Sequence, residues 1–162
     1  RAARACFESW LAARGGIGNG EVVAMLRQVQ RFMASHGEAK FTYWHRAADD
    51  HAGKTLQRVG VRCMLDQDGN EVRTNSRHSA EFGDRMPPAL GEGVSFNYYI
   101  LAEPFQSEVC QGFDHKAVAR VLLEHGCLVT KEPGRYSIKT KLPGIGPARC
   151  YCITPAIFGL DL

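Results

Sequence analysis

The sequence predicts an α+β fold in which an N-terminal helical pair precedes a small antiparallel sheet and a C-terminal helix and hairpin. Apolar residues recur at helical spacing before residue 40, and they alternate with polar residues over 56–65. From Asp114 onward, a helical pattern is followed by two short strand-like runs. The chain has 162 residues, which is enough to bury a hydrophobic core of its own.

Two helices are predicted in the N-terminal part of the chain. Residues 2–14 and residues 21–35 each carry apolar side chains at i, i+3 and i+4, and Gly37 is placed to end the second helix. We therefore expect 1–40 to form a helical segment that packs on the rest of the chain, 41–162.

Three strand-like segments follow. Phe41–Trp44 is a short aromatic run, and Leu56–Leu65 leads into the hairpin-turn sequence Asp66–Asn70. Ser95–Ala102 is the next clear strand. The polar residues 75–93 contain several glycines and two adjacent prolines, so we expect them to form an exposed loop inserted into the domain.

The last part of the chain predicts a winged helix-turn-helix. A short helix is expected at 105–110, and Asp114 can cap the N-terminus of the helix that follows it. Strands are predicted at Cys127–Thr130 and Tyr136–Lys141, with Pro133-Gly134 as the turn between them. Strand, short helix, turn, second helix and hairpin occur in that order in winged helices.

Basic residues concentrate in this same part of the chain. Between His115 and Cys150, seven lysines and arginines face two glutamates, a net charge of +5; the whole chain carries +3, so the remainder carries −2. A basic segment on a slightly acidic body is typical of a local contact with a polyanion.

Eight side chains of this segment are candidate nucleic-acid contacts. Arginine and lysine suit phosphate groups because they combine positive charge with several N–H donors. No Asn or Gln lies on the predicted exposed face of the helix, so we expect salt-sensitive backbone binding without adenine readout. The candidates are His115, Lys116 and Arg120 on the helix, Lys131, Arg135, Lys139 and Lys141 on the hairpin, and Arg149 beside it.

No cofactor or metal motif is complete, and none is predicted. Gly53-Lys54-Thr55 resembles the end of a phosphate-binding loop, but Ala48 stands where the first glycine is required. Asp66–Asn70 has the spacing of a calcium loop, but Glu71 replaces its glycine.

The six cysteines indicate reduced thiols. They include no C-x-x-C pair, and the sequence shows neither a secretory signal nor an apolar run long enough to span a membrane. We therefore expect a cytoplasmic protein with no membrane partner.

Several segments of the chain resemble one known family. The longest are YYILAEPFQSEVCQGFDHKAVARVLLEHGCLV and LPGIGPARCYCITPAI, and ARACFESWLAARGG, RQVQRFMASHGEAKF and QRVGVRC are also similar. The family is a helicase-like one of prophages, integrative elements and resistance cassettes, known as domain of unknown function 927. The resemblance covers most of the chain except the loop at 75–93.

This resemblance implies a role next to an ATPase. In that family a central region is similar to hexameric AAA+ ATPases, and its motifs lie upstream of the part resembled here. The resemblance thus implies a non-catalytic C-terminal domain of a DNA helicase, and it assigns no residue to hydrolysis. Because the chain begins without Met, we expect it to be an excised piece of a longer protein.

The sequence therefore favours a nucleic-acid-binding winged-helix domain with DNA as its partner. One alternative is a protein-interaction or ring-assembly module that contacts other copies of the parent protein. For each cation taken singly, a solvated surface is also an alternative, in which Arg120 pairs with Glu124. A third hypothesis, an enzyme that uses Cys110 or Ser107 with His115, lacks an acid to orient the histidine, so no catalysis is expected.

Overall fold

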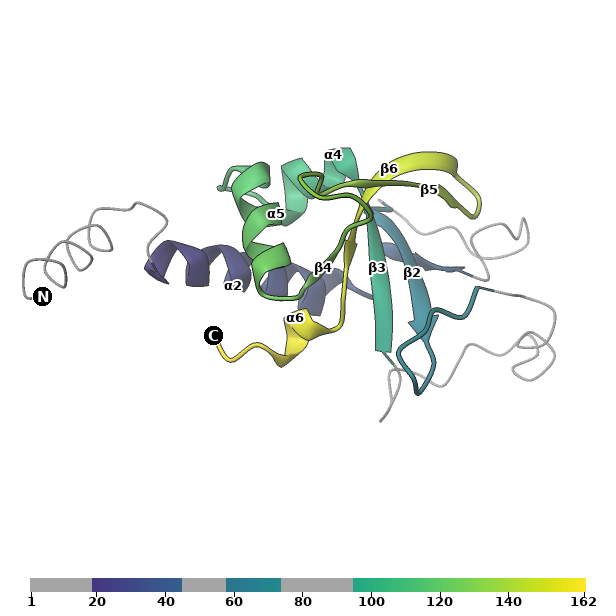
Figure 1. Ribbon diagram of the computed structural model, residues 1–162, viewed down its shortest axis with the longest axis horizontal. Coiled ribbons are helices and arrows are strands. Elements are labelled where there is room, and N and C mark those ends of the chain that lie inside the picture. The colour runs from purple at the N-terminus through teal and green to yellow at the C-terminus, as the bar shows by residue number, and fades with distance from the viewer. Residues whose placement is uncertain (1–18, 45–57, 74–94) are drawn as a thin grey trace, which may run out of the picture.

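Figure 1 shows the computed structural model of the chain, which describes residues 19–44, 58–73 and 95–162. The predicted first helix at 2–14 and the predicted loop at 75–93 lie outside the described residues. The chain has an α+β fold, as predicted, with helices gathered on one side of a sheet.

The predicted second helix is confirmed as α2, which spans Asn19–His36. Its apolar stripe is buried, because residues at helical spacing such as Met25, Val29 and Met33 face the sheet and the other helices. The amide of Gly37 donates to the carbonyl of Met33 at 2.8 Å, which completes the last turn.

The sheet has six strands and is mixed, whereas the sequence predicted a small antiparallel one. The first strand, β1, pairs in parallel with β2, and every other pairing is antiparallel. The spatial order is β1-β2-β3-β6-β4, with β5 also paired to β6. The strands are β1 Phe41–Tyr43, β2 Gly60–Leu65, β3 Ser95–Leu101, β4 Leu128–Val129, β5 Ile138–Leu142 and β6 Gly146–Ile153.

The helical segments that follow β3 lie close to their predicted positions. The short helix α4, Ala102–Pro104, runs into a π-helical turn, η2, at Phe105–Val109. A turn with Gly112 in the left-handed region, φ 88°, leads into α5, His115–Glu124. Asp114 caps α5 as predicted, since its side chain accepts a hydrogen bond from an amide of the first turn. A last short helix, α6 (Ala156–Gly159), follows β6.

The predicted hairpin between Cys127–Thr130 and Tyr136–Lys141 is wrong. Neither strand pairs with the other; β4 and β5 both pair with β6 along the same edge, through Val129 opposite Cys152 and Ile138 opposite Cys150. The segment Thr130–Ser137, here called the edge loop, leaves this edge after Cys152 and rejoins it at Cys150, so that it skips one residue of β6, Tyr151.

The hairpin turn is formed by Pro143-Gly144, and not by the predicted Pro133-Gly134. Pro143-Gly144 lies between β5 and β6, with Gly144 at φ 73° and the Ile145 amide bonded to the carbonyl of Leu142 at 3.2 Å. The strand β6 ends in four consecutive buried residues, so it lies in the interior of the sheet and takes partners on both sides. β6 offers β5 five paired positions, from Leu142 opposite Gly146 to Ile138 opposite Cys150, whereas β4 has only two residues.

The two faces of the sheet carry separate clusters of buried side chains. One face packs against α2, η2, α5 and α6, and on it the ring of Tyr151 stacks on that of Phe105 with centroids 3.9 Å apart. The other face holds a smaller cluster that includes Trp44, Tyr99 and Cys152. Both faces of β2 are therefore buried, although its sequence predicts one polar face.

Arg62 is the polar side chain that this burial affects most. It is only 7% exposed, and its guanidinium lies 4.8 Å from the ring of Phe96 and 5.9 Å from that of Tyr43. Its Nε and Nη1 atoms are buried and have no hydrogen-bond partner among the residues that the structure describes. Aromatic ring faces thus surround a charged group that is not fully satisfied.

Within the described ranges, no helix has the length and apolar character needed to cross a membrane.

Candidate nucleic-acid interface

Four of the predicted site residues meet at one place on the sheet edge. Lys131 and Arg135 come from the edge loop, Lys139 from β5 and Arg149 from β6, and together they line a hollow of about 120 Å³. All four side chains are exposed at its rim. The fold therefore converts cations spread over 19 sequence positions into one concave basic surface, here called the basic hollow.

The pairing of β5 with β6 fixes two of these cations. Lys139 lies directly opposite Arg149, while the preceding residue, Ile138, is buried with Cys150 on the other face. Because side chains alternate along a strand, Lys139 and Arg149 point to the same side of the hairpin. Arg149 Nη1 donates to Ser137 Oγ at 3.1 Å, which holds the guanidinium at the wall of the hollow.

The edge loop adds one carboxylate to the basic hollow. Glu132 also lines it, and its Oε2 lies 3.6 Å from Nε of Arg135. Both side chains are about two-thirds exposed, at 65% and 64%. An ion pair this exposed contributes little, typically about 0–1 kcal/mol, so Glu132 only loosely restrains Arg135.

Lys141 lies next to the basic hollow without lining it. It is two residues beyond Lys139 on the same face of β5, opposite Pro147, and its side chain is exposed. Lys139 and Lys141 form no ion pair with any residue that the structure describes. They are therefore a matched pair of exposed lysines that differ in their position relative to the hollow.

The three helix candidates form a separate group on α5. Lys116 and Arg120 are exposed, and Arg120 Nε lies 3.7 Å from Glu124 Oε1, the i, i+4 pair that the solvated-surface alternative predicts. His115 is partly buried, with Nδ1 4.0 Å from Asp114 Oδ1. The described contacts do not join this group to the basic hollow, so the predicted set of eight falls into two parts.

Sequence reasoning missed the two polar residues of the basic hollow that carry no positive charge, Ser137 and Glu132. The strand period of two was a usable signal for Ser137, because it places this residue on the same face as Lys139. From the sequence, Glu132 was only counted as one of the two acidic residues of the basic segment. Its position at the hollow depends on the path of the edge loop, and local sequence does not determine that path.

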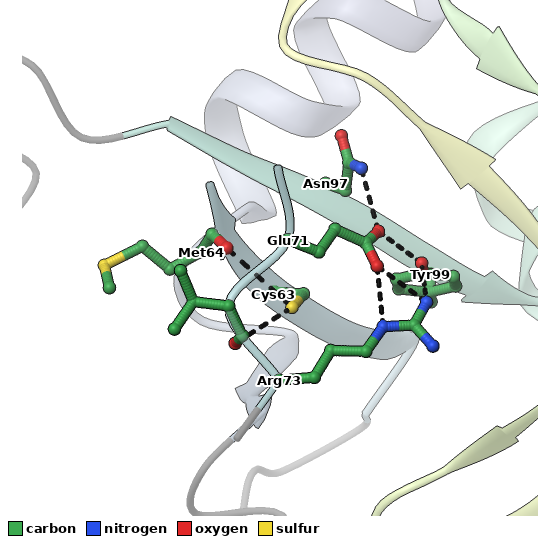
Figure 2. Close-up of polar contacts among 7 residues, drawn as sticks. Cys63, Met64, Glu71, Arg73, Asn97 and Tyr99 are labelled. Carbon is green, nitrogen blue, oxygen red and sulfur yellow. Dashed lines mark hydrogen bonds and ion pairs between the residues drawn. The ribbon is translucent and has the colours of Figure 1, made fainter. Parts of the chain in front are cut away.

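A second polar cluster lies on the other face of the sheet (Figure 2). Glu71 accepts hydrogen bonds from Asn97 Nδ2 at 2.8 Å, from the Tyr99 hydroxyl, and from Arg73 Nε at 2.7 Å. Arg73 Nη2 also donates to the Tyr99 hydroxyl at 2.6 Å, and the guanidinium lies 5.0 Å from the ring of Trp44. These groups bond to one another, so the cluster fastens the segment after β2 onto the sheet.

This polar cluster shifts the pKa of the Glu71 carboxylate. Burial raises the pKa of Glu71, but the hydrogen bonds from Asn97, Tyr99 and Arg73 outweigh burial and hold the pKa below its ordinary value of 4.5. Burial together with the neighbouring charge raises the pKa of the Tyr99 hydroxyl. Near neutral pH the pair is therefore an ionised carboxylate and a protonated phenol.

The described cysteines are poor nucleophiles. Burial raises the pKa of the Cys63, Cys110 and Cys152 thiols to about 12, and that of Cys150 to about 11. The thiolate is the reactive form, so these side chains stay inert near neutral pH. In the described part of the chain, no three His, Cys, Asp or Glu side chains are grouped to hold a metal ion.

Fold and site together define an α+β protein with a basic hollow at one edge of its sheet. No protein-family model, curated protein or solved structure matches the chain.

Proposed function

We propose that this chain is a non-catalytic nucleic-acid-binding module that contacts DNA mainly through its phosphate groups. The observation that carries the proposal is the meeting of Lys131, Arg135, Lys139 and Arg149 around one hollow with a single carboxylate. Separate surface cations on a soluble protein are common, but four that converge on a concave surface suit a polyanion.

A winged helix-turn-helix is part of this proposal. After β3 come the helical segment α4–η2, a turn that contains Gly112, and then α5, which is the order of a helix-turn-helix. The strand β6 lies between β3 and the β4–β5 edge, so the β5–β6 hairpin extends the same sheet as a wing. In this arrangement α5 approaches the major groove and the hairpin approaches the neighbouring backbone.

The resemblance to the helicase-like family supplies the wider context of the proposal. We propose that the module is the C-terminal accessory part of a mobile-element DNA helicase, whose ATPase motifs belong to another region. Phosphate contacts carry no sequence information, so such a module can hold a helicase on DNA of any sequence.

The experiment is DNA binding over a salt series. Anisotropy of labelled duplex and single-stranded DNA is measured with the wild type and with a variant in which Arg120, Arg135 and Lys139 are all alanine. We expect the logarithm of affinity to fall linearly with that of salt, by about 0.9 for each duplex phosphate neutralised, and the variant to show a smaller slope. Replacement of Arg27 and Arg31, exposed on α2, is the control for loss of charge alone.

Absence of binding at low salt, or equal binding by wild type and variant, would overturn the proposal. The second candidate, a protein-docking module, is favoured by one observation. The ring of Phe158 is 44% exposed beside a hollow of about 680 Å³ that Phe96 and Tyr98 also line. An interaction module of this kind does not respond to replacement of the cations at the sheet edge.

A further inference from the structure

We infer that the basic hollow is a seat for a single phosphate group, and that Glu132 is the carboxylate this phosphate displaces from Arg135. The inference rests on the proposed function, and it deepens that function by locating one defined contact. It begins from the size and the walls of the hollow, which are properties of the folded chain and not of its net charge.

The size of the hollow suits one tetrahedral oxyanion. Its volume of about 120 Å³ corresponds to several water molecules, each of which takes about 30 Å³ in the liquid. A phosphate group of a DNA backbone carries two free oxygens and needs donors on more than one side. Lys139 and Arg149 provide donors from the strands, and Lys131 and Arg135 provide them from the edge loop.

The walls are partly preorganised. Arg149 is held by its hydrogen bond to Ser137, at 3.1 Å, and its position in the β5–β6 ladder is fixed by the pairing with Lys139. A guanidinium that is already oriented loses less freedom when it binds an anion. The strand side of the hollow is therefore already arranged for an anion. On the loop side, Arg135 must first give up its contact with Glu132.

That change of partner occurs at Arg135. Its Nε lies 3.6 Å from Glu132 Oε2, longer than a good hydrogen bond, and both side chains are largely solvated. A phosphate that enters the hollow carries a charge of the same sign as Glu132, so it repels the carboxylate and takes over Arg135. Glu132 thus lowers the affinity of the hollow without blocking it.

The experiment titrates inorganic phosphate against sodium chloride at constant ionic strength. Binding is followed by NMR through the backbone amides of 131–149 and the arginine Nε–H signals. We expect saturable shifts around the hollow in the wild type and in Lys141→Ala, and loss of saturation in Lys139→Ala. Glu132→Gln is expected to bind phosphate about 1.4- to fivefold more tightly, because it removes a weak, exposed competitor.

Glu124→Gln is the matched control for the carboxylate. Glu124 is similarly exposed, at 60%, and it pairs with Arg120 at 3.7 Å on α5, away from the hollow. It is expected to leave the phosphate titration of the hollow unchanged. Shifts that grow without saturation, equal responses of Lys139→Ala and Lys141→Ala, or wild-type phosphate affinity in Glu132→Gln would each overturn the inference.

The same variants separate the inference from the proposed function. If duplex DNA binds in a salt-dependent manner while the hollow does not saturate with phosphate, the phosphate seat is wrong and the nucleic-acid function stands. If phosphate saturates the hollow while neither duplex nor single strands bind at low salt, the seat exists and the nucleic-acid function is wrong.

Discussion

Lys139 and Arg149 lie directly opposite each other across the β5–β6 ladder, and the hydrogen-bond partner of Arg149 is the neutral Ser137. Like charges at directly opposed positions destabilise a sheet, by up to about 1 kcal/mol. The β5–β6 hairpin therefore contains two opposed positive charges that lower its own stability. Such a conflict between local stability and sequence is typical of a functional site.

Reversal of one of these charges is expected to stabilise the fold. Lys139→Glu places a carboxylate opposite Arg149, and we expect the free energy of unfolding to rise by about 0.5–1 kcal/mol. The same change should weaken DNA binding more than Lys139→Ala does. Urea unfolding gives the stability, and Lys141→Glu, opposite Pro147, is the control with an expected change within about 0.5 kcal/mol. A Lys139→Glu variant less stable than the wild type would contradict the argument.

Arg62 is expected to be replaceable by an apolar residue at no cost. Two of its nitrogens lack a partner among the described residues, and each costs about 1–3 kcal/mol, whereas the contact with the Phe96 ring at 4.8 Å returns about 0.5–2 kcal/mol. Arg62→Met keeps most of the volume and removes the unpaired donors, so we expect equal or greater stability.

Thermal unfolding of Arg62→Met and Arg62→Ala tests this balance. The alanine variant should be destabilised by about 2 kcal/mol or more, because it leaves a cavity in the core. If the methionine variant loses as much stability as the alanine variant, the guanidinium of Arg62 stabilises the fold, and the argument is wrong.

The elements that sequence predicted well are those set by local signals. Helical spacing located α2 to within two residues at its N-terminus, and the Asp114 cap and the strand β3 were also predicted correctly. The polar face predicted for β2 was wrong at Arg62. Arg62 is buried against the rings of Tyr43 and Phe96, which come from two other strands, and the local sequence of β2 does not reveal them.

The hairpin could not be chosen from sequence alone, because two Pro-Gly pairs compete for the same reversal. Pro133-Gly134 and Pro143-Gly144 are both good turn sequences, and both glycines have positive φ angles, 78° and 73°. Only the pairing of β6 with β3 and β5 decides between them. The exposure of the seven lysines and arginines could be predicted, because charged side chains are mostly exposed. The convergence of four of them on one hollow could not be predicted.

Loss of the Glu71 charge is expected to destabilise the protein in a pH-dependent way. Because the folded-state pKa of Glu71 is below 4.5, its contribution is complete above the ordinary pKa and disappears as the pH falls through the folded-state pKa. Glu71→Gln should cost about 1–3 kcal/mol near neutral pH, since charged donors lose their acceptor. Urea unfolding at neutral and acidic pH measures the difference from wild type, which should shrink in acid.

The exposed Glu103 provides the control for this experiment. Glu103→Gln should have little effect at either pH. A Glu71→Gln penalty that is the same at both pH values would show that the carboxylate contributes through its shape and not through its charge.

Gly60 is expected to tolerate no side chain. A Cβ at this position in β2 would lie 1.8 Å from the carbonyl oxygen of Tyr99 on the adjacent strand. Gly60→Ala should therefore cost about 3 kcal/mol or more, through displaced backbone in a packed core. Gly20→Ala in α2, where a Cβ meets nothing within 4 Å, should stabilise by about 0.4–1 kcal/mol, because it lowers the conformational entropy of the unfolded chain. Circular dichroism melts compare the two, and equal effects would refute the close approach of β2 to β3.

The edge loop gives the molecule an evolutionary freedom that an ordinary hairpin lacks. Thr130–Ser137 occupies the place where one residue opposite Tyr151 would complete an unbroken edge strand. The loop can thus lengthen, shorten or change its charges by mutation while β4 and β5 keep their registers with β6. Sequence changes within this one segment can therefore alter the basic hollow while the paired strands of the sheet stay in place.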